Sequence, residues 1–167
     1  FKVNDTVVYP SHGVGVITGE EVQVIAGVEM KLYVISFEKD KMILRVPKNR
    51  AEKAGLRHLS SSNEFQKAID TLKGKARTAK GMWSKRAQEY EGKINSGDVI
   101  SISEVLRDLH KNVDDPDRSY SERMIYESAL ERFINEYAAA RTLNKDDASK
   151  EVLEILEEAN FKSAEAA

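Results

Sequence analysis

VNDTVVYPSHGVGVITG, residues 3–19, decides the class of fold at the start of the chain. The apolar run Val7–Tyr9 ends at a proline, and the next apolar run, Val14–Ile17, is interrupted and followed by glycines. Valine-rich runs separated by proline and glycine are typical of short strands joined by tight turns. We therefore predict β structure from the first residues onward.

The pattern of short strands continues to about residue 47. One predicted strand contains Val22 and Val24, and a turn at Ala26–Gly27 separates it from a strand with alternating Met30, Leu32 and Val34. A second turn, at Lys39–Asp40, precedes a last strand over 42–46, which Pro47 ends. Five closely spaced strands indicate a small curled sheet or barrel of the SH3 or Tudor type.

After residue 60 the chain has helical patterns. Each predicted helix combines a residue that caps helix starts with apolar residues three and four positions apart. The predicted starts are Ser62 or Asn63, Gly81–Met82, Ser101 in a capping box with Glu104, Ser119 with Glu122, and Asn144.

These patterns predict an α+β protein with two domains. We expect a Tudor/SH3-like β domain over residues 1–55, a linker over 56–62, a compact all-helical domain over 63–160 and a frayed tail over 161–167.

Composition excludes several classes of protein. Apolar residues make up 41% of the chain and charged residues 32%, which fits a soluble globular protein. No apolar run approaches the roughly 20 residues that span a bilayer. The chain has no cysteine, so disulfides, thiolate zinc sites and cysteine nucleophiles are excluded. We expect a cytoplasmic protein without membrane contact.

Residues that carry catalysis are scarce. His12, His58 and His110 are scattered, and none has a carboxylate or second histidine at metal-ligand spacing. The aspartates of the segment 114–117 lack the glycine and closing glutamate of a calcium loop. We therefore expect no catalytic residues, no metal and no cofactor. A hydrolase remains a distant alternative that would require a convergent acid–base pair in the folded chain.

The net charge of −2 hides a basic stretch over residues 71–88. This stretch contains no acid, and its six cations are Lys73, Lys75, Arg77, Lys80, Lys85 and Arg86. A run of cations is usually a solvated surface, but one without acids also attracts nucleic-acid phosphates. Residues 144–167 are acidic by contrast, with a charge of −4.

Trp83, the only tryptophan, lies inside the basic stretch. It shares a helical spacing with Ala87, Tyr90 and Ile94, which places it on a buried stripe. A tryptophan flanked by cations is also suited to stack on bases or to enter an opened base step. Spacing alone leaves these two interpretations about equal.

The strand over 42–46 also allows two interpretations. It is either the last strand of a closed barrel or an edge strand that pairs with a strand of a partner protein. In the second case main-chain hydrogen bonds supply the affinity and Arg45 sets the orientation.

The chain resembles the CarD/CdnL family of bacterial transcription regulators over nearly its whole length. The resemblance rests on the opening segment FKVNDTVVYPSHGVG, on LRVP at 44–47, on MWSKR at 82–86, on SGDV at 96–99 and on VLRDL at 105–109. The motifs occur in the family's order, which makes the resemblance specific.

The resemblance implies binding partners and residue roles. It implies that the β domain binds the RNA polymerase β subunit through Arg45, with Leu44, Val46 and Pro47 beside it. It also implies that the helical domain contacts promoter DNA in the minor groove at the upstream edge of the transcription bubble, largely independently of sequence, and stabilises the open complex. The resemblance further implies that Trp83 wedges into the minor groove there, with Lys85 and Arg86 as phosphate contacts. Lys80 and Arg77 of the same basic stretch would also contact DNA.

Two positions depart from the family pattern. Gln23 stands where some relatives carry a basic polymerase contact, and Gln88 stands where some carry a cation that helps to hold DNA.

Other functions stay open at this stage. The chain could be a protein-interaction adaptor whose Trp83 is buried. Its first domain also resembles the polymerase-interacting module of transcription-repair coupling factors, although this chain has no motor motifs. We expect a monomer that acts as a non-catalytic regulator.

Overall fold

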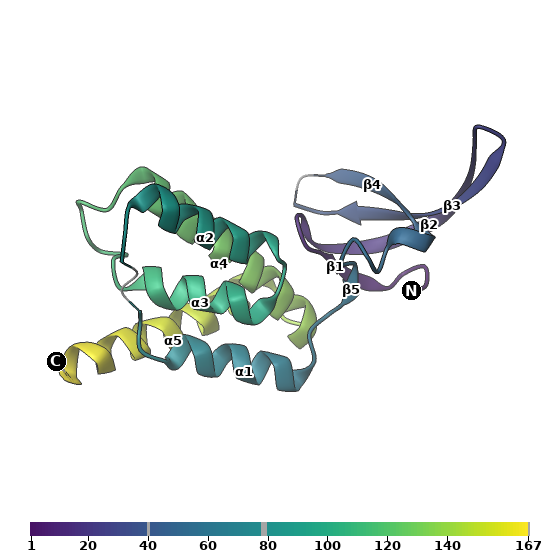
Figure 1. Ribbon diagram of the computed structural model, residues 1–167. Coiled ribbons are helices and arrows are strands. Elements are labelled where there is room, and N and C mark those ends of the chain that lie inside the picture. The colour runs from purple at the N-terminus through teal and green to yellow at the C-terminus, as the bar shows by residue number, and fades with distance from the viewer. Residues whose placement is uncertain (40, 78–79, 167) are drawn as a thin grey trace. The chain divides into compact units, whose positions relative to one another are not determined.

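The computed structural model describes residues 1–39, 41–77 and 80–166 and divides the chain into two compact units (Figure 1). The first unit covers Phe1–Leu59 and consists mainly of strands, and the second begins at Ser60 and is helical. The predicted α+β class with an N-terminal Tudor-like domain is confirmed.

The first unit is a single antiparallel sheet. Its strands lie in the order β4-β3-β2-β1-β5, so β4 and β5 are the two edges. The strands are β1 (Thr6–Tyr9), β2 (Gly13–Ile25), β3 (Val28–Phe37), β4 (Met42–Pro47) and β5 (Arg57–His58), and a short 3₁₀ helix, η1 (Lys48–Arg50), follows β4.

The predicted and observed strands agree in number, five, but differ in their bounds. We predicted separate strands before and after Gly19, but β2 is continuous and absorbs the irregularity as a register shift against β3 between Ile17 and Gly19. A bulge of this kind admits an extra residue without ending a strand. The pattern also missed β5, because a strand of only two residues has no visible alternation.

The turn between β2 and β3 forms where it was predicted. Ala26 and Gly27 both have positive φ, 52° and 78°, which is typical of the turns that join two twisted strands most tightly. The predicted turn at Lys39–Asp40 falls partly on Asp40, which lies outside the described residues.

The two faces of the sheet separate buried from outward side chains. Tyr33, Ile35 and Phe37 of β3 are in the core, and they stand opposite alternate residues of β4. Successive side chains of a strand point to opposite faces. Leu44 and Val46 of β4 therefore point into the core, whereas Ile43, Arg45 and Pro47 lie on the outer face.

The boundary between the units comes later than the composition indicated. We predicted a linker over 56–62, but Leu56 is buried in the core of the sheet and β5 pairs with β1. The backbone N–H of Ser60 then donates to the carboxylate of Glu136, at 2.8 Å, inside the helical unit. The stretch therefore divides at Leu59 into the end of one unit and the start of the other.

The second unit contains five helices in the described residues: α1 (Ser62–Lys73), α2 (Trp83–Asn95), α3 (Val99–His110), α4 (Tyr120–Arg141) and α5 (Lys145–Ala166). A capping box formed by Ser61 and Glu64 begins α1, and the Ser119 side chain accepts from the backbone of Glu122 at the start of α4. The predicted capping box of Ser101 with Glu104 is wrong, because Asp98 caps α3 and Ser101 lies inside the helix.

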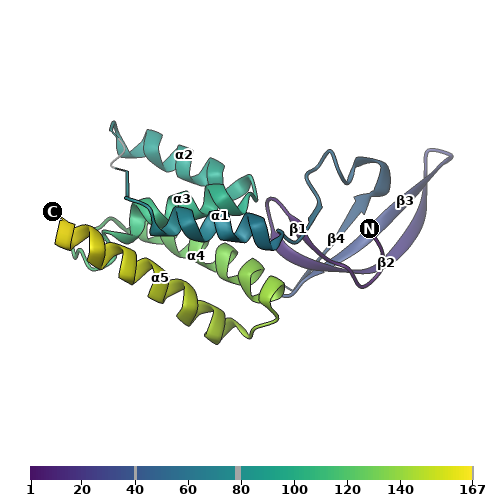
Figure 2. The same ribbon diagram turned by 90° about the horizontal axis from the view of Figure 1, so that it is seen from below.

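Helix α3 organises this unit. It packs against each of the other four helices, and the two views show it in the middle of the bundle (Figures 1 and 2). Val105 and Leu106 of α3 are fully buried and meet large rings such as Phe65 and Phe133 in one continuous core. The tail that we predicted as frayed from residue 161 continues α5 through Ala166.

No helix in the described part of the chain is long and apolar enough to cross a membrane.

A buried polar pair lies within the helical core. The Nδ1 atom of His110 is 2.6 Å from the hydroxyl oxygen of Tyr126, and both side chains are almost inaccessible to solvent. Burial lowers the pKa of His110, opposed by the charges of Glu157 and Asp114, and it raises the pKa of Tyr126 to about 12. Both groups are therefore held in their neutral forms.

We predict that replacing Gly15 by alanine destabilises the β unit. A Cβ atom there would lie 2.8 Å from the side chains of both Ile35 and Phe37. Overpacking of this kind costs about 1–3 kcal/mol of unfolding free energy. Urea unfolding followed by NMR signals of strand amides measures the loss. Gly19→Ala is the matched control, because no atom lies within 4 Å of its Cβ position; equal loss in both variants would contradict the packing argument.

We predict that His110 makes the helical unit less stable in acid. Because the pKa of His110 is lower in the folded chain than in the unfolded one, its contribution to stability is present above about pH 6.5 and is lost as the pH falls through the lower, folded pKa. Urea unfolding monitored by helical circular dichroism between pH 7.5 and 5 measures the slope. His110→Gln should flatten this slope, and an unchanged slope would exclude His110 as its source.

Candidate nucleic-acid interface and partner-binding strand

The basic stretch leads into the start of α2. Gly81 has φ +115°, a backbone conformation that side-chain-bearing residues rarely adopt, and Met82 follows as the residue that caps the helix. The Met82 side chain gives no capping hydrogen bond, and the first turn of α2 contains no acid. The start of α2 therefore presents cations and apolar side chains, and its first turn has no carboxylate that would neutralise the cations.

Trp83 has features of both interpretations, because it packs against the core and is also partly accessible. Its side chain is partly buried and packs against the helical core, where its ring centroid is 6.2 Å from that of Tyr90. The guanidinium carbon of Arg86 lies 5.4 Å from the centre of the tryptophan ring. The ring is thus held from within the domain while part of it stays accessible.

The cations near Trp83 are not equivalent. Lys85 is exposed, whereas Arg86 is half-buried beside the tryptophan, and its Nε atom is buried without a hydrogen-bond partner in the described structure. Neither has a carboxylate partner among the described residues, in contrast to Lys93, which pairs with Glu104 at 2.8 Å. Lys85 is therefore suited to contact a phosphate directly, and Arg86 first of all stabilises the position of the ring.

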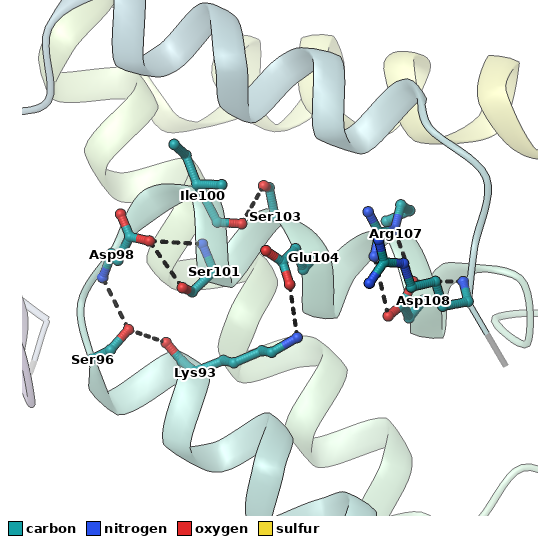
Figure 3. Close-up of polar contacts among 10 residues, drawn as sticks. Lys93, Ser96, Asp98, Ile100, Ser101, Ser103, Glu104, Arg107 and Asp108 are labelled. Carbon is teal, nitrogen blue, oxygen red and sulfur yellow. Dashed lines mark hydrogen bonds and ion pairs between the residues drawn. The ribbon is translucent and has the colours of Figure 1, made fainter. Parts of the chain in front are cut away.

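The segment before α2 is attached to α3 by its backbone. The N–H of Arg77 donates to the carboxylate of Asp108 at 2.9 Å, and the same carboxylate pairs with Arg107 at 2.8 Å (Figure 3). The side chains of Arg77 and Lys80 remain exposed. These two cations therefore face solvent. Thr78 and Ala79 lie outside the described residues.

Helix α2 is fixed to α3 at its other end. Figure 3 shows the ion pair between Lys93 and Glu104 and the turn in which Asp98 accepts from the backbone and hydroxyl of Ser101, at 3.1 and 2.9 Å. The Ser96 hydroxyl donates to the Lys93 carbonyl at 2.6 Å in the same turn. Held at both ends, α2 keeps Trp83 in one place on the domain.

Sequence reasoning missed Met82. It is 76% exposed although it directly precedes Trp83. Helical spacing starts at Trp83 and assigns Met82 no face, so the periodicity could not show its exposure. The preceding Gly81 was the available signal, because a glycine before a helix often marks a sharp change of chain direction.

Strand β4 is an edge of the sheet and not a strand of a closed barrel. It pairs with β3 on one side, and no described strand pairs with its other side. Exposed edge groups of this kind can pair with a strand of another chain.

The outer face of β4 carries an ion pair. Arg45 donates to the two carboxylate oxygens of Glu21 at 2.8 and 3.3 Å, with side chains 47% and 39% exposed respectively. The hydrogen bond from Arg45 lowers the pKa of Glu21, and the same bond raises that of Arg45. Exposed pairs of this kind are weak, so a partner's carboxylate can displace Glu21 at little cost.

The four residues predicted to bind polymerase divide between two faces. Arg45 and Pro47 lie on the outer face, where a partner can reach their side chains. Val46 is only 4% exposed, and Leu44 packs against the core. These two side chains hold the strand in the sheet, so only the backbone groups of these residues are open to a partner.

Among the described residues, no group of three or more histidines, aspartates or glutamates is placed to hold a metal ion.

Known families match both units. The family described as "CarD-like/TRCF RID domain" matches residues 1–60, and the one described as "CarD, C-terminal domain" matches residues 67–154, more than half of the chain. "Putative transcription factor YdeB" of Bacillus subtilis (strain 168) is 24% identical over 136 residues, which cover 81% of this chain and 89% of that protein. The chain therefore belongs to the CarD family and is a transcription regulator.

Proposed function

We propose that this protein is a non-catalytic regulator that binds the RNA polymerase β subunit through β4 and stabilises the open promoter complex by contacting DNA at the upstream edge of the bubble. The observation that carries the proposal is the partly accessible Trp83 ring, fixed at the start of α2 among cations that have no carboxylate partner in the described structure.

The DNA contact follows from the chemistry of this end of α2. Lys85, Lys80 and Arg77 are exposed, and phosphate contacts of lysine and arginine supply affinity without reading sequence. An aromatic ring beside them can stack on a base that lacks its own neighbour. Such a base occurs where a duplex opens.

The polymerase contact follows from β4. Its free edge offers backbone donors and acceptors in the regular spacing of a strand, and Arg45 projects beside them from the outer face. A partner strand that carries an acidic residue opposite Arg45 satisfies both features. The match of the first unit to the CarD-like/TRCF RID family supports polymerase as that partner.

The two contacts need not be strong separately. Attachment of the first unit to polymerase raises the effective concentration of the second at the bubble. A ring that fits opened DNA and not closed DNA shifts the equilibrium towards the open form. One aromatic stack contributes about 1–3 kcal/mol, a shift of roughly five- to hundredfold.

We predict that Trp83→Ala retains polymerase binding but shortens the open-complex lifetime by about five- to hundredfold. The substitution removes the stacking ring and leaves β4 unchanged. A fluorophore within the bubble reports the decay of the complex after competitor is added.

Trp83→Phe is the matched variant, because it keeps an aromatic ring against Tyr90 and should retain part of the lifetime. A lifetime in Trp83→Ala equal to that of the unsubstituted chain would show that the ring has no role at the bubble.

We predict that Arg45→Glu abolishes capture of the polymerase β subunit. The new carboxylate repels both Glu21 and an acidic partner, and the exposure of the site leaves the fold intact. Pull-down with core polymerase measures the loss. Lys53→Glu, the same change of charge at an exposed residue outside the strands, is the control. Undiminished capture by Arg45→Glu would remove Arg45 from the interface.

A protein-interaction adaptor without DNA contact is the second candidate, and the packing of Trp83 against Tyr90 favours it. In that case the ring only stabilises α2. The two candidates differ in tryptophan emission when forked DNA is added in excess to the chain alone, whose single tryptophan is Trp83. A ring that contacts the fork changes its emission, and a ring that serves only the core does not.

A further inference from the structure

We infer that Met82 is a second DNA-contacting side chain, which enters the opened base step ahead of Trp83. The inference rests on the proposed function and assigns a role to a residue outside the predicted site. The two side chains together form what we call the apolar tip, Met82–Trp83.

Exposure distinguishes the two members of the apolar tip. Met82 is 76% exposed, whereas Trp83 is partly buried and packs against the helical core. A large apolar side chain left in water costs free energy that burial against a ligand recovers. Met82 is therefore the part of the tip that gains most from contact with bases.

The backbone holds Met82 in this outward position. Its carbonyl accepts the N–H groups of Lys85 and Arg86 at 3.2 and 3.1 Å, which ties the residue to the first turn of α2. Gly81, with its positive φ, turns the chain immediately before it. The main chain at position 82 is thus fixed while most of its side chain is open to solvent.

Trp83 is constrained where Met82 is not. The centre of the tryptophan ring is 6.2 Å from that of Tyr90 and 5.4 Å from the guanidinium carbon of Arg86, so deep insertion into DNA would separate it from both. Methionine is among the apolar side chains that proteins insert between base steps, and its unbranched thioether adapts to an irregular gap. We assign insertion to Met82 and stacking at the edge of the opened step to Trp83.

The test compares Met82→Gln and Met82→Leu with the unsubstituted chain in complexes of polymerase and promoter DNA. Glutamine keeps the length of the side chain but is polar, and leucine keeps it apolar. We expect Met82→Gln to shorten the open-complex lifetime about fivefold, as expected when roughly half of an apolar side chain loses its burial. Met82→Leu should retain most of the lifetime.

Phe161→Gln is the matched control, an exposed apolar residue of α5 at 63% exposure. It should leave the lifetime unchanged, and pull-down should show equal polymerase binding by all three variants. If Met82→Gln matches the unsubstituted chain while Trp83→Ala shortens the lifetime, the role of Met82 is wrong and the proposed function stands. If the unsubstituted chain itself does not prolong the lifetime, both are wrong.

Discussion

The contact between the rings of Trp83 and Tyr90 determines where the start of α2 stands on the helical domain. Tyr90 is buried in the core, so the tryptophan inherits the rigidity of that core while it keeps an accessible part. Arg86 covers the ring, and the ion pair of Lys93 with Glu104 holds the far end of the same helix. A side chain that is to stack on an opened base step needs such support, because a loosely held ring would lose conformational entropy on binding.

The proposed function gives each domain its own partner and its own kind of contact. The first offers a regular row of backbone groups on β4, with Arg45 as the one exposed charge on that strand. The second offers cations and the apolar tip, which we propose to contact nucleic acid weakly and independently of sequence. Because the two domains are covalently connected, binding through the stronger contact raises the effective concentration of the second domain at its own partner.

Much of this arrangement could be predicted from the sequence. Apolar periodicity and capping residues located the helices to within a few residues, and the Ala26–Gly27 turn followed from its composition. Periodicity could not show that a bulge at Gly19 joins two strand patterns, nor that Asp98 and not Ser101 caps α3. The site residues Trp83, Lys85 and Arg45 came from charge and resemblance, whereas the exposure of Met82 and the pairing of Arg45 with Glu21 depend on tertiary neighbours that spacing does not contain.

The most direct measurement uses the absence of cysteine in this chain. Ser84→Cys places a single thiol on an exposed position beside Trp83, and a photoactivatable cross-linker attached there marks the DNA that it meets. With polymerase and promoter DNA, our account predicts cross-links confined to the upstream edge of the bubble, lost when Arg45→Glu is added. Cross-links spread evenly along the DNA, or none while polymerase remains bound, would contradict it.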